Sequence, residues 1–242
     1  MSSQPVDVQD AGFRRAWAVA DRIPGWLTEP QARMLWDAAS RLRTGATVVE
    51  IGSHQGRSTV VLGAAARRRG ARVVAVDPFV EGRLFGGRPT RALFEEHVRA
   101  AGLDGTVELV AEYSTRLRPR WTIPVDLLYV DGKHDYWTCS DDLRWARNLP
   151  PGGQVLVHDA FSSVGVTAAL LTHLLVGGRL RYRERSGSMA LLDTVPPRLA
   201  DRLRVAAQLP WFARNVAVKL ALRLRLRPLA RVLGHHDAVD PY

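Results

Sequence analysis

Two aspartates and a histidine stand where two neighbouring apolar runs end, within residues 125–161. Asp131 follows the run VDLLYV and Asp159 follows GQVLVH, with one helix-length segment between them. That layout predicts a βαβ unit, whose parallel strands end at the sheet edge where ligands bind. We therefore expect Asp131, Asp159 and His134 to converge, as a hard-metal site or an acid and base pair. The alternative is that Asp131 only caps a helix and Asp159 only closes a turn.

A second candidate site is the segment 48–59, VVEIGSHQGRST, which predicts a strand, a glycine-containing turn and the start of a helix. Gly52 and Gly56 would let the backbone approach a ligand, and the N–H groups that begin a helix bind a carboxylate or a phosphate. Asp77 ends the next apolar run, where an acidic side chain can accept hydrogen bonds from ribose hydroxyls. Because Glu50 replaces the first glycine of a pyrophosphate-binding loop, the pattern favours a nucleoside cofactor that carries an amino acid group.

The rest of the chain supplies the elements that position these residues. Short apolar runs alternate with helix-length spacers, which is typical of an α/β domain with a doubly wound sheet. Strands are expected near 46–51, 72–77, 106–111, 125–130, 153–158, 179–184 and 188–193, the last two as an antiparallel hairpin. Helices are expected near 11–22, 29–43, 57–69, 90–102, 136–147 and 163–175. The Gly-rich loop 78–89 at the same edge is expected to be a lid, with a passive loop as the alternative.

The amino-acid composition limits the kinds of protein that this chain can be. The 242 residues are 46% hydrophobic and 24% charged, as in a soluble globular protein with one principal domain. The single Cys139 excludes an internal disulfide and a thiolate-rich zinc site, and it fits a reducing compartment. No run reads as a signal peptide or a clean membrane span. We therefore expect a cytoplasmic protein.

The net charge of +10 is concentrated near the C-terminus. Residues 195–242 hold nine Lys or Arg and three Asp, so they carry +6 of the excess. Over 220–227, leucines alternate first with Ala221 and then with Arg223, Arg225 and Arg227, and either a strand or a helix there would be amphipathic and cationic. The segment could bind an anionic surface as a peripheral membrane contact, an acidic polymer or a neighbouring subunit, or it could pack on its own domain.

Five motifs in order give residues 45–193 a resemblance to a known family. The motifs are EIGSHQGRST, VVAVDPF, LVAEYS, LLYVDGKHDY and LPPGGQVLVHDAF. They resemble the class I S-adenosylmethionine-dependent methyltransferases, and within these the small metal-dependent O-methyltransferases with D-G-x-H and H-D or E-D motifs, such as macrolide-sugar and polysaccharide enzymes. The resemblance implies a Rossmann-like, doubly wound, seven-stranded sheet with an antiparallel last strand. It divides the chain into an N-terminal helical cap (1–44), the methyltransferase domain (45–194) and a basic C-terminal extension (195–242).

The resemblance also implies roles for single residues. S-adenosylmethionine would lie against Glu50, Gly52, Ser53, Ser58, Asp77, Glu112, Tyr113, Ser114 and Asp131. Asp131, Asp159 and His158 would hold Mg²⁺. Relatives that bind metal firmly offer a third side-chain oxygen beside the second aspartate, whereas this chain has His158 before Asp159 and Ala160 after it. His134 and Asp131 would be the catalytic residues, with His134 as the base that deprotonates the acceptor hydroxyl. Lys133 is the alternative candidate for this base.

The resemblance says least about the acceptor. A small molecule or a glycan is expected, in a protein that forms a homodimer. The alternative is an RNA-directed methyltransferase or nucleic-acid-binding protein that uses the basic extension. Because the sequence has no recognisable RNA-binding module, nucleic acid is the less favoured partner.

Overall fold

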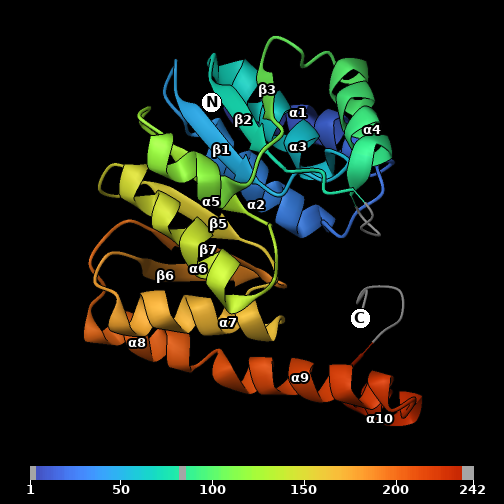
Figure 1. Ribbon diagram of the computed structural model, residues 1–242, viewed down its shortest axis with the longest axis vertical. Coiled ribbons are helices and arrows are strands. Elements are labelled where there is room, and N and C mark those ends of the chain that lie inside the picture. The colour runs from blue at the N-terminus through green and yellow to red at the C-terminus, as the bar shows by residue number, and fades with distance from the viewer. Residues whose placement is uncertain (1–3, 82–85, 236–242) are drawn as a thin grey trace.

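The computed structural model describes residues 4–81 and 86–235. Its strands form one sheet in the order β3-β2-β1-β4-β5-β7-β6 (Figure 1). They are β1 (Thr47–Ile51), β2 (Arg72–Val76), β3 (Val107–Val110), β4 (Leu127–Val130), β5 (Gln154–Val157), β6 (Arg181–Ser186) and β7 (Met189–Asp193). β1 to β5 pair in parallel, and β7 pairs antiparallel with both β5 and β6. The predicted seven-stranded sheet with an antiparallel last strand is confirmed. Residues 82–85 of the predicted lid loop lie outside the described residues.

Helices cover both faces of this sheet, which is why its central strands are buried and mostly apolar, with Glu50 in β1 as an exception. One face carries α1 (Gln4–Ala20), α2 (Glu29–Ser40), α3 (Arg57–Arg69) and α4 (Gly87–Ala100). The other carries α5 (Ser114–Leu117), α6 (Tyr136–Leu143) and α7 (Val164–Leu171). Short 3₁₀ turns follow at Arg118–Arg120 and Arg144–Asn148, and a π turn follows at Thr172–Val176. Val48 packs into the first core and its neighbour Val49 into the second, as the alternation of strand side chains requires.

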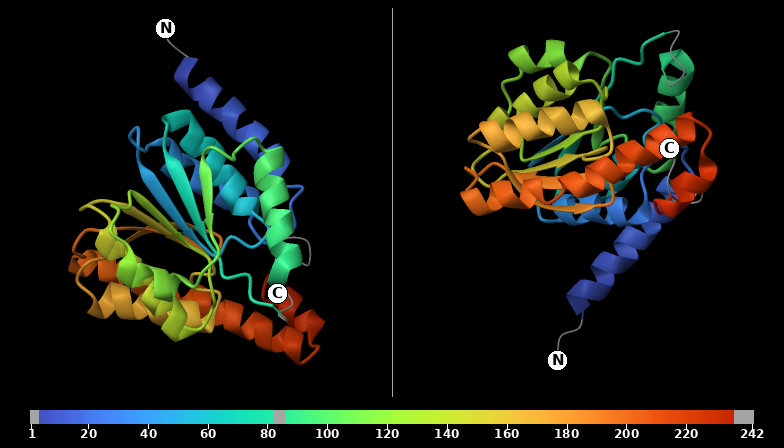
Figure 2. Two further views of the ribbon diagram at one scale, coloured as in Figure 1. Left: turned by 45° about the horizontal axis from the view of Figure 1, so that its top comes forward. Right: turned by 90° about the horizontal axis from the view of Figure 1, so that it is seen from below.

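The C-terminal extension is helical. It forms α8 (Leu199–Ala206), α9 (Leu209–Arg223) and α10 (Arg227–Val232), so the choice between strand and helix is settled in favour of helix. Trp211 and Phe212 at the start of α9 pack against the second core. α9 therefore runs past α7 on that face (Figure 2), and α10 folds back onto α9. Among the described residues, no helix has the length and apolar character that crossing a bilayer requires.

Candidate active site

The carboxyl ends of four parallel strands meet along one edge of the sheet. Beyond the last strand residues, backbone hydrogen bonds continue for one more position. The N–H of Asp131 donates to Ile51 at 2.8 Å, the N–H of His158 to Val130 at 2.9 Å, and the N–H of Gly52 to Val76 at 2.9 Å. The first residue after β1, after β4 and after β5 is therefore held in register with its neighbour. Because these strands lie side by side in the sheet, the residues that the sequence predicted for the site meet at this edge.

Gly52 is required by the contact between two of these strand ends. Its φ of 86° lies in the left-handed region, and a Cβ atom there would overlap the carbonyl oxygen of Asp131. Any side chain would both strain the turn and push the ends of β1 and β4 apart. The sequence predicted a glycine for approach to a ligand, and the structure shows a glycine that lets the turn after β1 touch the backbone of Asp131.

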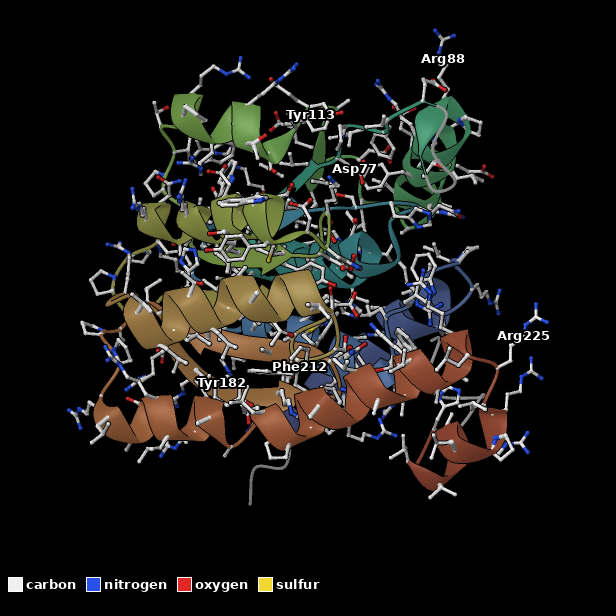
Figure 3. All side chains as sticks on the ribbon, turned by 60° about the horizontal axis from the view of Figure 1, so that its bottom comes forward. Asp77, Arg88, Tyr113, Tyr182, Phe212 and Arg225 are labelled. Carbon is white, nitrogen blue, oxygen red and sulfur yellow. The ribbon has the colours of Figure 1, made fainter. Side chains whose placement is uncertain are left out.

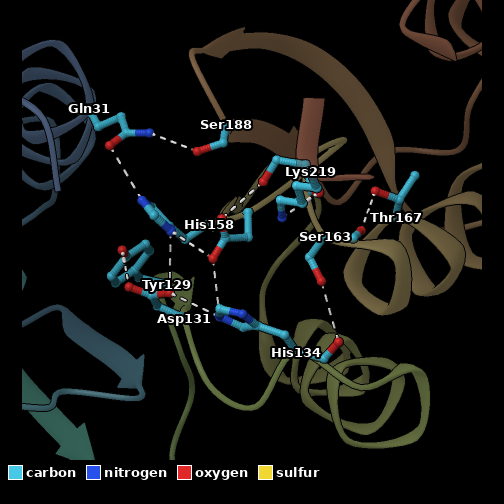
Figure 4. Close-up of polar contacts among 11 residues, drawn as sticks. Gln31, Tyr129, Asp131, His134, His158, Ser163, Thr167, Ser188 and Lys219 are labelled. Atoms are coloured by element: carbon cyan, nitrogen blue, oxygen red, sulfur yellow. Dashed lines mark hydrogen bonds and ion pairs between the residues drawn. The ribbon is translucent and has the colours of Figure 1, made fainter. Parts of the chain in front are cut away.

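Two carboxylates and two imidazoles form a cluster at the end of β4 and β5 (Figure 4). His134 Nε2 lies 3.1 Å from Asp159 Oδ2 and 4.0 Å from Asp131 Oδ1. His158 Nδ1 lies 3.4 Å from each of the same two oxygens. Ligand atoms of Asp131, His134 and Asp159 lie within 4.8 Å of one another, close enough to share one ion. The predicted convergence of Asp131, Asp159 and His134 is therefore present in the fold.

His158 is held by a residue that the sequence did not single out. Gln31 Oε1 accepts the N–H of Thr28 at 2.9 Å and lies 3.3 Å from His158 Nε2, while Gln31 Nε2 donates to Ser188 Oγ at 3.1 Å. Because that Oε1 is an acceptor, His158 Nε2 carries a proton toward it, and Nδ1 faces the carboxylates. Burial lowers the pKa of His158, but the two carboxylates outweigh burial and raise it to about 9. The buried ring is thus an imidazolium between two acids.

The two carboxylates differ in their surroundings. Burial raises the pKa of Asp131, and the nearby Asp159 adds to this, although Tyr129 donates its hydroxyl to Asp131 at 2.9 Å. Burial acts in the same direction on Asp159, but the hydrogen bond and charge of His158 prevail and hold its pKa well below the usual range. Ser162 Oγ also donates to Asp159 at 2.9 Å. Asp159 is therefore the firmly ionised member of the pair.

The turn that carries Asp159 is fixed from the C-terminal extension. Asp159 and Phe161 have φ values of 54° and 57°, which are unfavourable for residues with a Cβ. Asn215 of α9 donates to the carbonyl of Phe161 at 3.0 Å, and Lys219 donates to the carbonyl of Ser162 at 2.8 Å. α9 therefore touches the backbone of the candidate site, a contact that sequence reasoning missed.

The residues predicted to bind the cofactor shape the turn after β1. Glu50 is fully buried and accepts the hydroxyls of Ser58 and Thr59, each at 2.5 Å. Burial raises the pKa of Glu50 to about 7, although both hydroxyls act against it. Asp77 accepts the N–H groups of Ser53 at 3.1 Å, His54 at 3.0 Å and Phe79 at 2.9 Å. Because its carboxylate holds the turn in place, Asp77 has a structural task beside the predicted ribose contact.

The segment after β3 lies on the same edge, where Tyr113 and Asp77 are labelled in Figure 3. Tyr113 is exposed, whereas the buried Ser114 donates to Asp142 of α6 at 2.5 Å. Arg120 pairs with both oxygens of Glu112. Burial raises the pKa of Asp142 to about 7, and no motif had pointed to this residue. The predicted contacts of Glu112, Tyr113 and Ser114 with adenine stay predictions.

Known proteins share this domain and this fold. Residues 49–160 match the family model described as a methyltransferase domain. Three solved structures superpose on most of the chain. Cofactor-bound Rv0187 from MTB is 20% identical, covers 80% of this chain and 99% of its own, and has a TM-score of 0.57. The O-methyltransferase TomG of Streptomyces achromogenes, solved with SAM, is 20% identical over 81% of this chain and 100% of its own, with a TM-score of 0.56.

An O-methyltransferase from Bacillus cereus in complex with SAH is 18% identical over 77% of this chain and 91% of its own, with a TM-score of 0.56. At these identities the superpositions establish a common fold, and the family model matches residues 49–160 as a methyltransferase domain. The strand order, the turn after β1 and the cluster at the ends of β4 and β5 agree with both findings. Residues 49–160 therefore match a methyltransferase domain, and the chain shares its fold with the three solved proteins named here.

Proposed function

We propose that the protein transfers a methyl group from S-adenosylmethionine to a hydroxyl of a sugar, a polysaccharide or a natural product, with His134 as the general base. The observation that supports this most is the pairing of His134 with the ionised Asp159, beside the turn that the methyltransferase fold uses for its cofactor. A nitrogen base next to a carboxylate at that edge suits removal of a proton from a hydroxyl.

The cofactor side of the edge fits S-adenosylmethionine. Gly56 caps the start of α3 with a φ of 90°, and a Cβ atom there would lie 3.3 Å from the ring of Phe94, so the turn needs a glycine at this position. A carboxylate offers about four acceptor positions, and Asp77 uses three, which leaves room for a ribose hydroxyl. When bound, S-adenosylmethionine supplies a methyl group activated by its positive sulfur. The chain's task is then to hold the acceptor oxygen in line with that methyl group.

His134 is better placed than Lys133 to take the proton. Since Asp159 is ionised, it accepts a hydrogen bond from His134 Nε2 and leaves Nδ1 to receive the proton of the acceptor. The carboxylate then stabilises the imidazolium that forms. Lys133 lies 2.9 Å from Asp135 Oδ2, so its ammonium group is engaged in an ion pair with a residue outside the cluster. The geometry therefore favours His134 between the two candidates.

Asp131 and Asp159 suit a hard divalent cation such as Mg²⁺, which prefers carboxylate oxygens and retains several waters. A cation held there would lower the pKa of an acceptor hydroxyl beside it. His158 opposes such binding as long as Nδ1 is protonated, so it can serve as a ligand only after it loses that proton. We therefore propose metal assistance that strengthens as His158 deprotonates. Titration with Mg²⁺ in a weakly buffered solution should release protons, and a sample that takes up no Mg²⁺ even above pH 9, where His158 is neutral, would remove the metal from the proposal.

An exposed aromatic surface next to the base supports a sugar-like acceptor. Trp137 follows His134 by three residues in the first turn of α6, and it is 80% exposed. Tyr136 contacts it edge-on with ring centres 4.9 Å apart. An exposed indole offers a flat apolar face on which the C–H face of a sugar ring can pack.

Two variants test the proposed function. His134→Ala should bind S-adenosylmethionine with unchanged affinity by calorimetry and should lose at least about a hundredfold in methyl transfer to a panel of sugar and natural-product alcohols. Lys133→Ala is the matched control, since it removes the neighbouring base and should keep most of the activity. A His134→Ala variant as active as the wild type would contradict the assignment of the base. A purified protein with no affinity for the cofactor would contradict the function as a whole.

A further inference from the structure

The turn between α9 and α10 exposes leucines and arginines together. We call residues 223–229, with the sequence RLRLRPL, the basic tip. Each of its residues is exposed, including Leu224 at 59%, Leu226 at 47% and Leu229 at 49%. Large apolar side chains at such exposure, gathered within seven residues, are unusual on a surface that faces only water.

The tip is built on a fixed support. α9 and α10 pack through Val218, Ala221 and Ala230, with Leu222 and Leu233 against them. Leu224, Leu226 and Leu229 are not part of this cluster. Arg214 ties the end of α10 to α9, because its Nε donates to the carbonyl of Leu233 at 2.7 Å and its Nη2 to the carbonyl of Gly234 at 2.5 Å. The exposure of the leucines therefore follows from how the two helices pack.

The tip lies beyond the site edge of the molecule. α9 contacts the Asp159 turn through Asn215 and Lys219, and the tip starts four residues after Lys219. Figure 3 shows Arg225 at the far end of α9, past the body of the domain, and the views of Figure 2 agree. A surface bound to the tip would therefore be next to the edge at which the acceptor enters.

We propose that the basic tip docks the protein onto an anionic lipid bilayer. Leu224, Leu226 and Leu229 would enter the boundary between headgroups and acyl chains, while the arginines at 223, 225 and 227 would contact anionic headgroups. The sequence contains no Asp or Glu between Asp201 and Asp237, so the tip has no acidic side chain nearby along the chain to weaken that attraction. This proposal does not depend on which hydroxyl the enzyme methylates.

Two other occupants fit the tip less well. A second copy packed tip to tip across a two-fold axis would bring arginines against arginines, which costs free energy. A nucleic acid would use the arginines, but its phosphate backbone gives no reason for three exposed leucines between them. An anionic bilayer can bind both the arginines, through its headgroups, and the leucines, through its acyl chains.

Sedimentation with vesicles tests the proposal on the full chain. Vesicles of phosphatidylcholine alone and vesicles with about one third phosphatidylglycerol are compared at physiological salt. The wild type should bind the anionic vesicles and not the neutral ones. The triple change Arg223→Glu, Arg225→Glu and Arg227→Glu should lower partitioning by at least about a hundredfold, because each arginine near the surface contributes about a fivefold factor.

The control is Arg14→Glu, Arg15→Glu and Arg22→Glu, which changes the net charge equally at exposed positions of the N-terminal cap. It should change partitioning by less than about threefold, since charges far from the membrane are screened. Leu224→Ser with Leu226→Ser keeps every charge and should lower partitioning about tenfold through lost apolar burial.

Three results would overturn the proposal. The first is a wild type that binds neither kind of vesicle. The second is salt-dependent binding to generic RNA that the leucine changes leave intact, without vesicle binding. The third is a dimer in light scattering that the leucine changes dissociate, again without vesicle binding. Calorimetry with S-adenosylmethionine on every variant separates these results from a failure of the proposed methyl transfer.

Discussion

Replacement of Asn215 by alanine tests whether α9 holds the turn that carries Asp159. The Asn215 side chain is 2% exposed and donates to the carbonyl of Phe161 at 3.0 Å. Phe161 is itself fully buried, so water cannot replace the lost donor without opening the contact. The turn also contains two residues with positive φ, each of which costs on the order of 1–3 kcal/mol unless the surroundings impose it.

The magnitude follows from these contacts. A buried carbonyl left without its donor costs about 1–3 kcal/mol, and the shortened side chain adds a small cavity. The free energy of unfolding should therefore fall by about 2–3 kcal/mol, which lowers the melting temperature by roughly 4–12 °C for a chain of this size. If the turn relaxes, the Asp159 carboxylate moves away from His134, so methyl transfer should fall by more than the loss of folded protein explains. The affinity for S-adenosylmethionine should stay close to that of the wild type.

The measurements are thermal unfolding and methyl transfer at a temperature where the variant is fully folded. Asn215→Asp is the second variant, since it keeps the volume and replaces the donor with a charge that the Phe161 carbonyl repels. Arg223→Ala is the matched control on the same helix, because its side chain is exposed, and it should change stability by no more than about 0.5 kcal/mol. Wild-type stability and turnover in both Asn215 variants would show that the contact is incidental and refute the reasoning.

Three further predictions concern the sheet edge. Gly52→Ala should destabilise the fold by on the order of 2–4 kcal/mol and weaken cofactor binding, measured by unfolding and calorimetry, because its Cβ would overlap Asp131. Without added metal, His158 should stabilise the fold below about pH 6.5, with that stability lost as the pH rises through about 9, so His158→Gln should cost more stability at pH 6 than at pH 10. Asp142 has a raised pKa of about 7, so its ionisation should destabilise the native state between about pH 4 and 7, and Asp142→Asn should unfold at a higher temperature than the wild type at pH 8. If the stability of a variant changed with pH in the same way as that of the wild type, the titration proposed for that residue would be contradicted.

The sequence was sufficient to predict the sheet and the meeting of Asp131, His134 and Asp159. The parallel strands are mostly apolar runs. A residue that ends a parallel strand must lie at one known edge of the sheet, so its neighbours there follow from the strand order. The predicted helices also overlap observed ones, because their apolar periodicity reports the face that each buries.

The residues that support the cluster could not be predicted in this way. Gln31 meets His158 across 127 positions, and Asn215 meets Phe161 across 54. Such contacts depend on how a helix is oriented on the finished sheet, which no local pattern encodes. The alternation of leucine and arginine after residue 220 was ambiguous for a different reason. It spans the end of one helix and the turn to the next, so it reflects neither the pleat of a strand nor one helical face.

The cluster of Asp131, His134, His158 and Asp159 is held by contacts from all three segments into which the sequence divides the chain. Residues 49–160 of the matched domain contain the groups that can react, and they end one residue after Asp159. The groups that hold the cluster come from outside that range, with Gln31 in the N-terminal cap and Asn215 and Lys219 in the C-terminal extension. Because Asp159 lies in a turn of unfavourable φ, its position depends on those outside contacts as well as on its own strand. A change in either appended segment can therefore alter the chemistry at the site without touching any residue of the methyltransferase motifs.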